Sequence, residues 1–172
     1  MKKWNTKTVA MLGVLVALHI VASRFLAINV TPSLRFSFSS SFVMLAGIWF
    51  GPVSGMLVGA LADLLGCVIG GYAPFLPLTV TPVLIGLLSG LLAPVFHKTK
   101  NILMYGALIA GITFLTTFLY GTWAQTLLQG IAYWTLAGPR ALQAICAAVL
   151  NTLIVYALYR SPVTRMIYDS EK

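Results

Sequence analysis

The chain has 172 residues, of which 59% are hydrophobic and 8% are charged. A soluble domain of this length carries about a quarter of its residues as charges, so the composition excludes a soluble globular protein and predicts one that lies in a lipid bilayer. Lys and Arg number 11 against 3 Asp and Glu, but they form no stripe with interleaved aromatic residues, so we expect no nucleic-acid partner.

The first apolar run covers about residues 8–27 and follows Lys2 and Lys3, a pattern shared by signal peptides. Arg24 and Phe25, however, stand where a cleavage site would need small residues, and the run is longer than the apolar core of a typical signal peptide. We interpret it as the first membrane helix.

Breaks rich in Gly and Pro divide the whole chain into apolar runs, several of them close to the roughly 20 residues that a helix needs to cross a bilayer. One break is the pair Gly51-Pro52, and another is the polar stretch from Gly121 to Gly138. The sequence predicts an all-α membrane protein with a single domain over residues 1–172 and six transmembrane helices, at about 8–27, 36–50, 53–71, 77–96, 101–121 and 138–160.

Basic residues gather in alternate loops. They lie in the N-terminal segment, at 98–100 and in the C-terminal segment, whereas the opposite loops carry almost no charge. Because cytoplasmic loops of membrane proteins are enriched in Lys and Arg, both termini are expected in the cytoplasm.

Three arginines depart from this rule. Arg24, Arg35 and Arg140 lie at or near the predicted outer ends of spans one, two and six. Arg24 and Arg35 could extend their side chains to outer headgroups, and Arg140 could cap a helix start. Together they suggest cationic groups at the mouth of a cavity that admits an anionic solute.

Asp63 is the one acid within the predicted spans. Gly55 and Gly59 precede it at intervals of four residues, so its side chain lies on a face of small residues, which in membranes packs against other helices. It should lie about 12 Å below the outer end of its helix, near the middle of the bilayer. Ionisable groups at that depth are functional candidates, although Asp63 could instead be structural, paired with Arg24, hydrogen-bonded to Ser and Thr, or simply kept protonated.

Aromatic residues follow the predicted outer loops. Such residues usually form an interfacial belt, but as a group they also suit a flat aromatic ligand with negative charge. The candidates are Tyr72, Phe75 and Trp123, with Tyr133 and Trp134 nearby.

Motifs for catalysis are missing from the sequence. It contains no G-x-x-x-x-G-K-[ST], no H-E-x-x-H and no G-x-S-x-G. Cys67 and Cys146 have no metal-ligand spacing and are expected to be buried packing residues. We therefore expect no enzyme, no catalytic residues, no metal and no cofactor, but a binding subunit that takes its energy from a partner.

The chain resembles the S components of energy-coupling factor (ECF) vitamin transporters, and within them the folate-specific branch. The resemblance is strongest in "SRFLAI" (23–28), "LRFSFSSSFVMLAGIWFGPVSGMLVGALADLLG" (34–66) and "GGYAPFLPLTVTPVLIGLLSG" (70–90). It implies capture of folate or a related pterin at the plasma membrane of a prokaryote. It also implies an ECF transmembrane coupling protein and two ATPase subunits as partners.

The family docks its coupling protein through small residues on the first helix, which match Ala10, Gly13 and Ala17 here. On a straight helix these residues and Arg24 fall within about 60° of one another. Arg24 would then face outward with them, unless the helix is kinked, so it ranks below Asp63 and Arg140 as a ligand contact.

A pterin has an amino group and a ring N–H side by side, which one carboxylate can accept as a pair, and the glutamate tail of folate carries carboxylates that suit arginine. Asp63 and the outer arginines therefore fit both ends of folate. An S component for another solute, such as pantothenate or a queuine-like deazapurine, and a membrane scaffold or assembly protein remain as alternatives.

Overall fold

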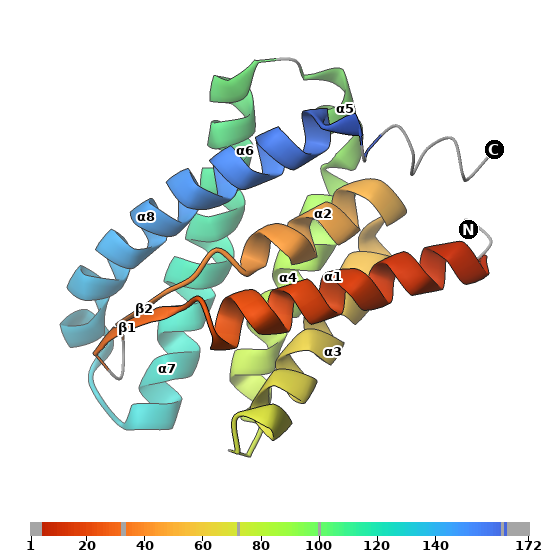
Figure 1. Cartoon of the computed structure of the whole chain (residues 1–172). Helices are drawn as coiled ribbons and strands as arrows, with labels where there is room; N and C mark the ends of the chain where they lie inside the picture. The colour runs from red at the N-terminus through yellow and green to blue at the C-terminus, as the bar shows by residue number, and fades with distance from the viewer. Residues whose placement is uncertain (1–4, 32–33, 72, 100, 163, 165–172) are drawn as a thin grey trace.

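The structure is a computed structural model that describes residues 5–31, 34–71, 73–99, 101–162 and 164. Its helices form one bundle, with a short β-hairpin between the first two (Figure 1). In chain order the elements are α1 (Thr6–Arg24), β1 (Ile28–Thr31), β2 (Leu34–Phe36), α2 (Ser40–Phe50), α3 (Pro52–Ile69), α4 (Leu76–Leu91), α5 (Ala93–Lys98), α6 (Ile102–Thr113), the π-helix η1 (Phe114–Tyr120), α7 (Gly121–Gln129) and α8 (Tyr133–Arg160).

Six apolar helical segments confirm the all-α fold with six spans. Within the described residues, four are long and apolar enough to cross a bilayer: α1, α3, the continuous segment Ile102–Gln129 and α8. The other two, α2 and α4, are shorter apolar helices. The chain starts α1 and ends α8 at the same end of the molecule (Figure 1), as an even number of spans requires.

One predicted boundary is wrong. The stretch from Gly121 to Gly138 was expected to be a loop, but α7 continues to Gln129 and α8 already begins at Tyr133. The turn is confined to three residues and starts at Gly130, whose φ of 66° favours glycine. Thr122, one of the polar residues of this stretch, is buried and accepts a hydrogen bond from Arg140 across the bundle.

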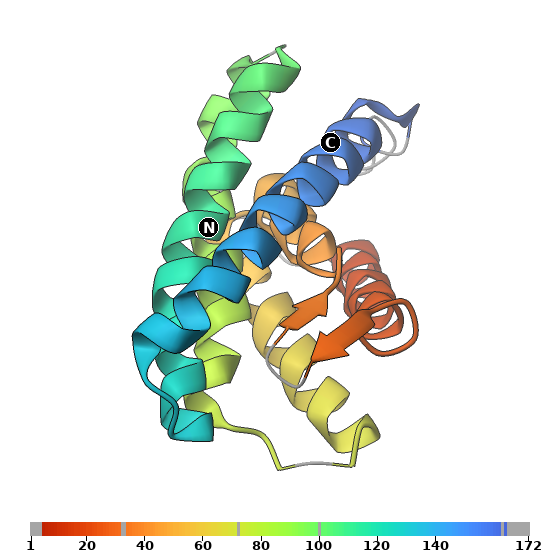
Figure 2. The same ribbon diagram turned by 90° about the vertical axis from the view of Figure 1, so that its left-hand side faces the viewer.

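The second span also begins later than predicted. Residues 34–36 form β2 rather than the start of a helix, and β2 pairs with β1 in antiparallel register, with Asn29 opposite Arg35. The hairpin lies beside the last turn of α1 (Figure 2), and β2 contacts α8. It joins the outer ends of the first and last spans.

Helices α3 and α4 approach each other so closely that their backbones touch. A Cβ atom at Gly55 would lie 2.5 Å from the carbonyl oxygen of Gly86, and one at Gly59 would lie 2.5 Å from that of Pro82. Only glycine permits this distance. The predicted face of small residues therefore packs against a helix, and it brings Asp63 of α3 next to Thr79 of α4.

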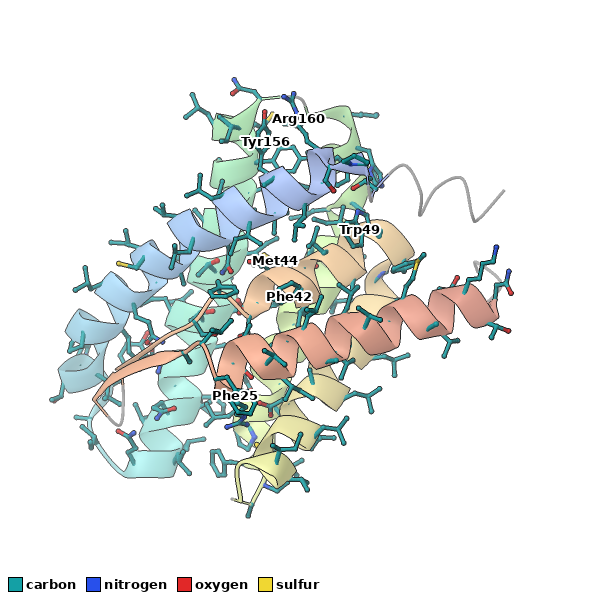
Figure 3. All side chains as sticks on the ribbon, in the orientation of Figure 1. Phe25, Phe42, Met44, Trp49, Tyr156 and Arg160 are labelled. Carbon is teal, nitrogen blue, oxygen red and sulfur yellow. The ribbon has the colours of Figure 1, made fainter. Side chains whose placement is uncertain are left out.

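Helix α2 lies at the centre of the bundle, which explains its composition. Every residue from Val43 to Phe50 is buried, so the helix is apolar all round. Figure 3 shows Phe42, Met44 and Trp49 along this helix in the middle of the molecule. Met44 is also one of the residues that line the cavity described next.

Candidate functional site

A cavity of about 220 Å³ lies between the helices and receives residues from all six spans. Its lining is unusually polar for an intramembrane space, with a cation, an acid, a histidine, several hydroxyl groups and two amides. Polar groups that converge in a concave site are the usual sign of ligand binding. Those used below are His19, Arg24, Asp63, Thr81, Thr113 and Asn151.

Asp63 lines this cavity from α3, as its place on the small-residue face predicted. Its Oδ2 accepts a hydrogen bond of 2.7 Å from the hydroxyl of Thr79 on α4. An ionised carboxylate offers about four acceptor positions, so this bond orients the group and leaves most of its capacity for a ligand. Thr79 is itself fixed, because it is buried and lies on the first turn of α4.

Arg24 also lines the cavity, contrary to the expectation that a straight first helix would direct it outward. Helix α1 is continuous to Arg24, but the long side chain turns back toward α3, where Nη2 lies 3.8 Å from the Sγ of Cys67. Gly66 makes room for it, since a Cβ there would lie 2.9 Å from Nη2. The cavity thus receives an arginine from span one and an aspartate from span three.

Arg140 is not among the described residues that line the cavity. It is only 8% exposed, and its guanidinium is bonded inside the bundle. Nε donates to Thr122 Oγ1 at 3.0 Å, and Nη2 donates to the carbonyl oxygen of Thr117 at 3.2 Å. Thr117 belongs to η1 and does line the cavity. Arg140 therefore attaches α8 to the π-helical wall, a type of helix distortion that is frequent at functional sites.

The other candidates are not among the described residues that line the cavity. Tyr72 lies outside the described residues. Arg35 is placed in β2 by its backbone. Phe75 precedes α4, and Trp123 is half exposed on α7 with its ring 5.6 Å from that of Tyr120. Tyr133 and Trp134 are in edge contact with each other. Of the aromatic residues that the structure describes, Phe75, Trp123, Tyr133 and Trp134 are not part of the cavity lining that contains Asp63.

Sequence reasoning missed several residues of the site. His19 belongs to no motif in the sequence, but it is buried, and its Nδ1 lies 3.0 Å from the carbonyl oxygen of Ser39. Asn151 is also buried and accepts a 2.7 Å hydrogen bond from Ser41. The serines between 37 and 41 were the available signal, because a polar run at the start of an apolar helix needs partners inside the bundle.

The small residues of the first helix face away from the bundle. Ala10, Gly13 and Ala17 are exposed, and a Cβ added at Gly13 would meet no atom within 4 Å among the described residues. Larger apolar side chains, Val14 and Leu18 among them, are exposed beside them. This face of α1 is therefore open to lipid or to another protein.

Comparisons with known proteins agree with this architecture. The family model "ECF-type riboflavin transporter, S component" matches residues 3–161. The folate transporter FolT of Clostridium novyi (strain NT) is 29% identical over 166 residues, which cover 93% of this chain and 91% of that protein. The crystal structure of FolT bound with folic acid superposes with a TM-score of 0.74 at 26% identity, over 90% of this chain and 93% of that one.

S components are transport subunits, not enzymes, and work with an ECF energising module in the prokaryotic plasma membrane. The match over nearly the whole chain, together with six helical spans around a polar cavity, establishes that this protein belongs to the S components of ECF-type transporters.

Proposed function

We propose that this S component captures folate, or a closely related pterin, from outside the cell. The observation that carries the proposal is the position of Asp63 in the cavity, oriented by Thr79. The folate transporters similar to this chain over almost its full length support the same choice.

The carboxylate of Asp63 favours a pterin over a flavin. The pyrimidine edge of a pterin presents an amino group beside a ring N–H, so it offers two donors to one carboxylate. The matching edge of an isoalloxazine presents a single N–H between two carbonyl oxygens, which would face an acceptor-only group. Charge-assisted hydrogen bonds are among the strongest in proteins, so this difference is large enough to select the ligand.

The size of the cavity and its cation agree with this proposal. A volume of about 220 Å³ is below the range usual for a whole drug-sized ligand, so the cavity would hold the ring system of folate and not the whole molecule. The benzoyl-glutamate tail would then extend beyond the cavity. Arg24 at its wall and Arg35 in the hairpin are the cations that we propose for the carboxylates of that tail.

Arg140 would act on the ligand indirectly. Its hydrogen bonds to Thr122 and to the carbonyl of Thr117 hold a wall of the cavity in place. We propose it as a positioning residue rather than as a contact for the folate tail.

The exposed face of α1 would dock the energising module. Ala10, Gly13 and Ala17 allow a partner helix to approach the backbone closely. We propose that this partner is the transmembrane coupling protein, which in turn binds two ATPase subunits. The chain itself has no P-loop to supply the energy.

Riboflavin is the second candidate, because the matching family model is described as a riboflavin transporter component. The test is direct binding by the purified protein in detergent, measured by isothermal calorimetry with folic acid, riboflavin and pantothenate in parallel. We expect tight binding of folic acid alone. Binding of riboflavin or pantothenate without folic acid would replace the proposal, and binding of none of the three would favour a scaffold role.

A further inference from the structure

Several threonine hydroxyls in these helices are bonded to their own backbone. Thr116 donates to the carbonyl of Ile112 at 2.7 Å, and Thr152 donates to that of Ala148 at 2.6 Å. This bond to the residue four positions earlier is the local option open to any helical threonine. In an apolar environment this bond gives the hydroxyl a hydrogen-bond partner.

Two threonines depart from this pattern. The Oγ1 atoms of Thr81 and Thr113 are buried and have no hydrogen-bond partner among the described residues. Thr113 is only 2% exposed. A buried polar group without a partner is costly and therefore calls for an explanation. Since a bond to the backbone is available to both, the absence of that bond in two places needs a common cause.

That cause is the cavity. Thr81 on α4 and Thr113 on α6 both line it, as Asp63 does, whereas Thr116 and Thr152 do not. The two residues that carry these hydroxyls therefore border the space that a ligand would occupy. Because they come from different helices, they are positioned by the tertiary fold and not by a shared local motif.

We propose that Thr81 and Thr113 form a second recognition edge of the site, at which their hydroxyls bind the hydrogen-bond acceptors of the ligand ring. The inference rests on the proposed function and deepens it. Asp63 accepts from the donor edge of the heterocycle, and the two hydroxyls donate to its carbonyl oxygen or ring nitrogens. A hydroxyl can rotate and can also accept, so this edge tolerates ring nitrogens with or without a proton. Specificity for the ring thus comes from both edges.

The test uses the variants Thr81→Val and Thr113→Val, which keep the shape of the side chain and remove the hydroxyl. Thr116→Val is the matched control, since Thr116 is equally buried in the adjoining helical segment but is bonded to Ile112. The purified full-length proteins are titrated with folic acid and with 6-carboxypterin, which lacks the tail. Thermal unfolding is followed with and without ligand.

Each cavity variant should weaken both ligands by about 5- to 50-fold, the range for leaving one buried acceptor unpaired. The unfolding temperature of the ligand-free variants should be unchanged or slightly raised, because no internal hydrogen bond is lost. Only the increase in unfolding temperature that the ligand causes should become smaller. Thr116→Val should lower the unfolding temperature and leave affinity unchanged. Thr113→Ser keeps the hydroxyl and removes only the methyl group, so it should bind the ligands as the wild type does. It serves as the test if Thr113→Val fails to fold.

If the valine variants bind with wild-type affinity while Asp63→Asn has lost binding, the inference is overturned, because the hydroxyls would then bind only water. The proposed function would stay in place. Loss of affinity in Thr113→Ser as large as in Thr113→Val would also overturn it. A wild-type protein that binds neither folic acid nor 6-carboxypterin would overturn the proposed function and the inference together.

Discussion

Asp63 and Arg24 show how a few charged residues can shape a membrane site. They come from different helices, and both line the same cavity of an otherwise apolar bundle. Asp63 is oriented by one hydrogen bond from Thr79, and Arg24 passes across Gly66 to reach the same space. A charge inside a bilayer is costly and faces the bundle interior or a water-filled cavity, so the cavity is where these two residues are tolerated.

Asp63→Asn should weaken binding of folic acid and of 6-carboxypterin by the same factor, about 10- to 100-fold. The substitution replaces one acceptor with a donor that faces another donor, and charge-assisted bonds of this kind are worth about 1.5–3 kcal/mol. Calorimetric titration of both ligands measures the effect. If the variant elutes as a single species, unfolds at the wild-type temperature and binds 6-carboxypterin normally, Asp63 is structural.

Arg140→Ala should weaken both ligands and also lower the unfolding temperature. The variant removes the two hydrogen bonds to Thr122 and Thr117 and empties a buried volume, at a cost of several kcal/mol. Arg35→Ala is the comparison, since a contact with the folate tail alone would reduce affinity for folic acid and spare 6-carboxypterin. The same tail-only pattern in Arg140→Ala, with unchanged stability, would make Arg140 a ligand contact.

At the scale of elements, α3 and α4 form the most closely packed pair. Gly55, Gly59 and Gly86 let the two backbones touch, and this contact sets the position of Asp63 relative to Thr79. In a bilayer, van der Waals contact of this kind contributes much of the driving force for helix association. The same contact therefore stabilises the bundle and shapes the site.

Gly86→Ala should destabilise the protein by about 1–3 kcal/mol, because the added Cβ would lie 2.2 Å from the carbonyl oxygen of Gly55 and the backbones would have to separate. Thermal unfolding in detergent measures the loss. Gly111→Ala is the matched control on α6, where a Cβ meets no described atom within 4 Å. It should be neutral or stabilising by up to about 1 kcal/mol, and equal effects in both variants would contradict the packing argument.

Helix α1 provides the opposite case, since its small residues are exposed. Gly13→Leu should leave folding and ligand affinity unchanged, because the position has open space. It should reduce assembly with the energising module and hence uptake, because the added side chain would hold a partner helix away. Co-purification with the module and uptake into proteoliposomes measure this. Undiminished assembly and uptake would place the docking surface elsewhere.

On the scale of the whole molecule, the ends of the six spans agree with the charge distribution. The start of α1, the end of α8 and the loop after α5 carry most of the basic residues, and α5 itself ends with His97 and Lys98. Figure 3 shows Arg160 and Tyr156 together near the end of α8, where the guanidinium lies 4.8 Å from the centre of the ring. Such a cation–π pair suits the polar boundary of a membrane.

This arrangement predicts the orientation. After Cys67 and Cys146 are replaced by alanine, a cysteine at Thr99 should be labelled by an impermeant thiol reagent only from the cytoplasmic side, and one at Gln129 only from outside. Thr99 follows α5 and Gln129 ends α7, so the two positions lie at opposite ends of the segment from α6 to α7. Labelling of Thr99 from outside would overturn the topology.

Local properties of the sequence were enough to determine the class of the protein. Apolar runs near the length of a bilayer, with Gly and Pro between them, predicted the six spans, and the basic loops predict their orientation, because hydrophobic length and charge act segment by segment. The direction of Asp63 was also predictable. Its spacing of four residues from Gly55 and Gly59 fixes one face of a helix whatever the rest of the chain does.

Only the tertiary structure decided which polar residues meet. A polar residue in an apolar segment can end a helix, face a headgroup or pair across the bundle, and the sequence around it is the same in all three cases. Thr122 therefore lies in a stretch that the sequence predicts to be a loop, although it accepts a hydrogen bond from Arg140, 18 residues away. His19, Arg24, Thr81, Thr113 and Asn151 line one cavity because helices distant in the chain pack together there. Long side chains add a further freedom, since Arg24 reaches inward from a helix face that points outward.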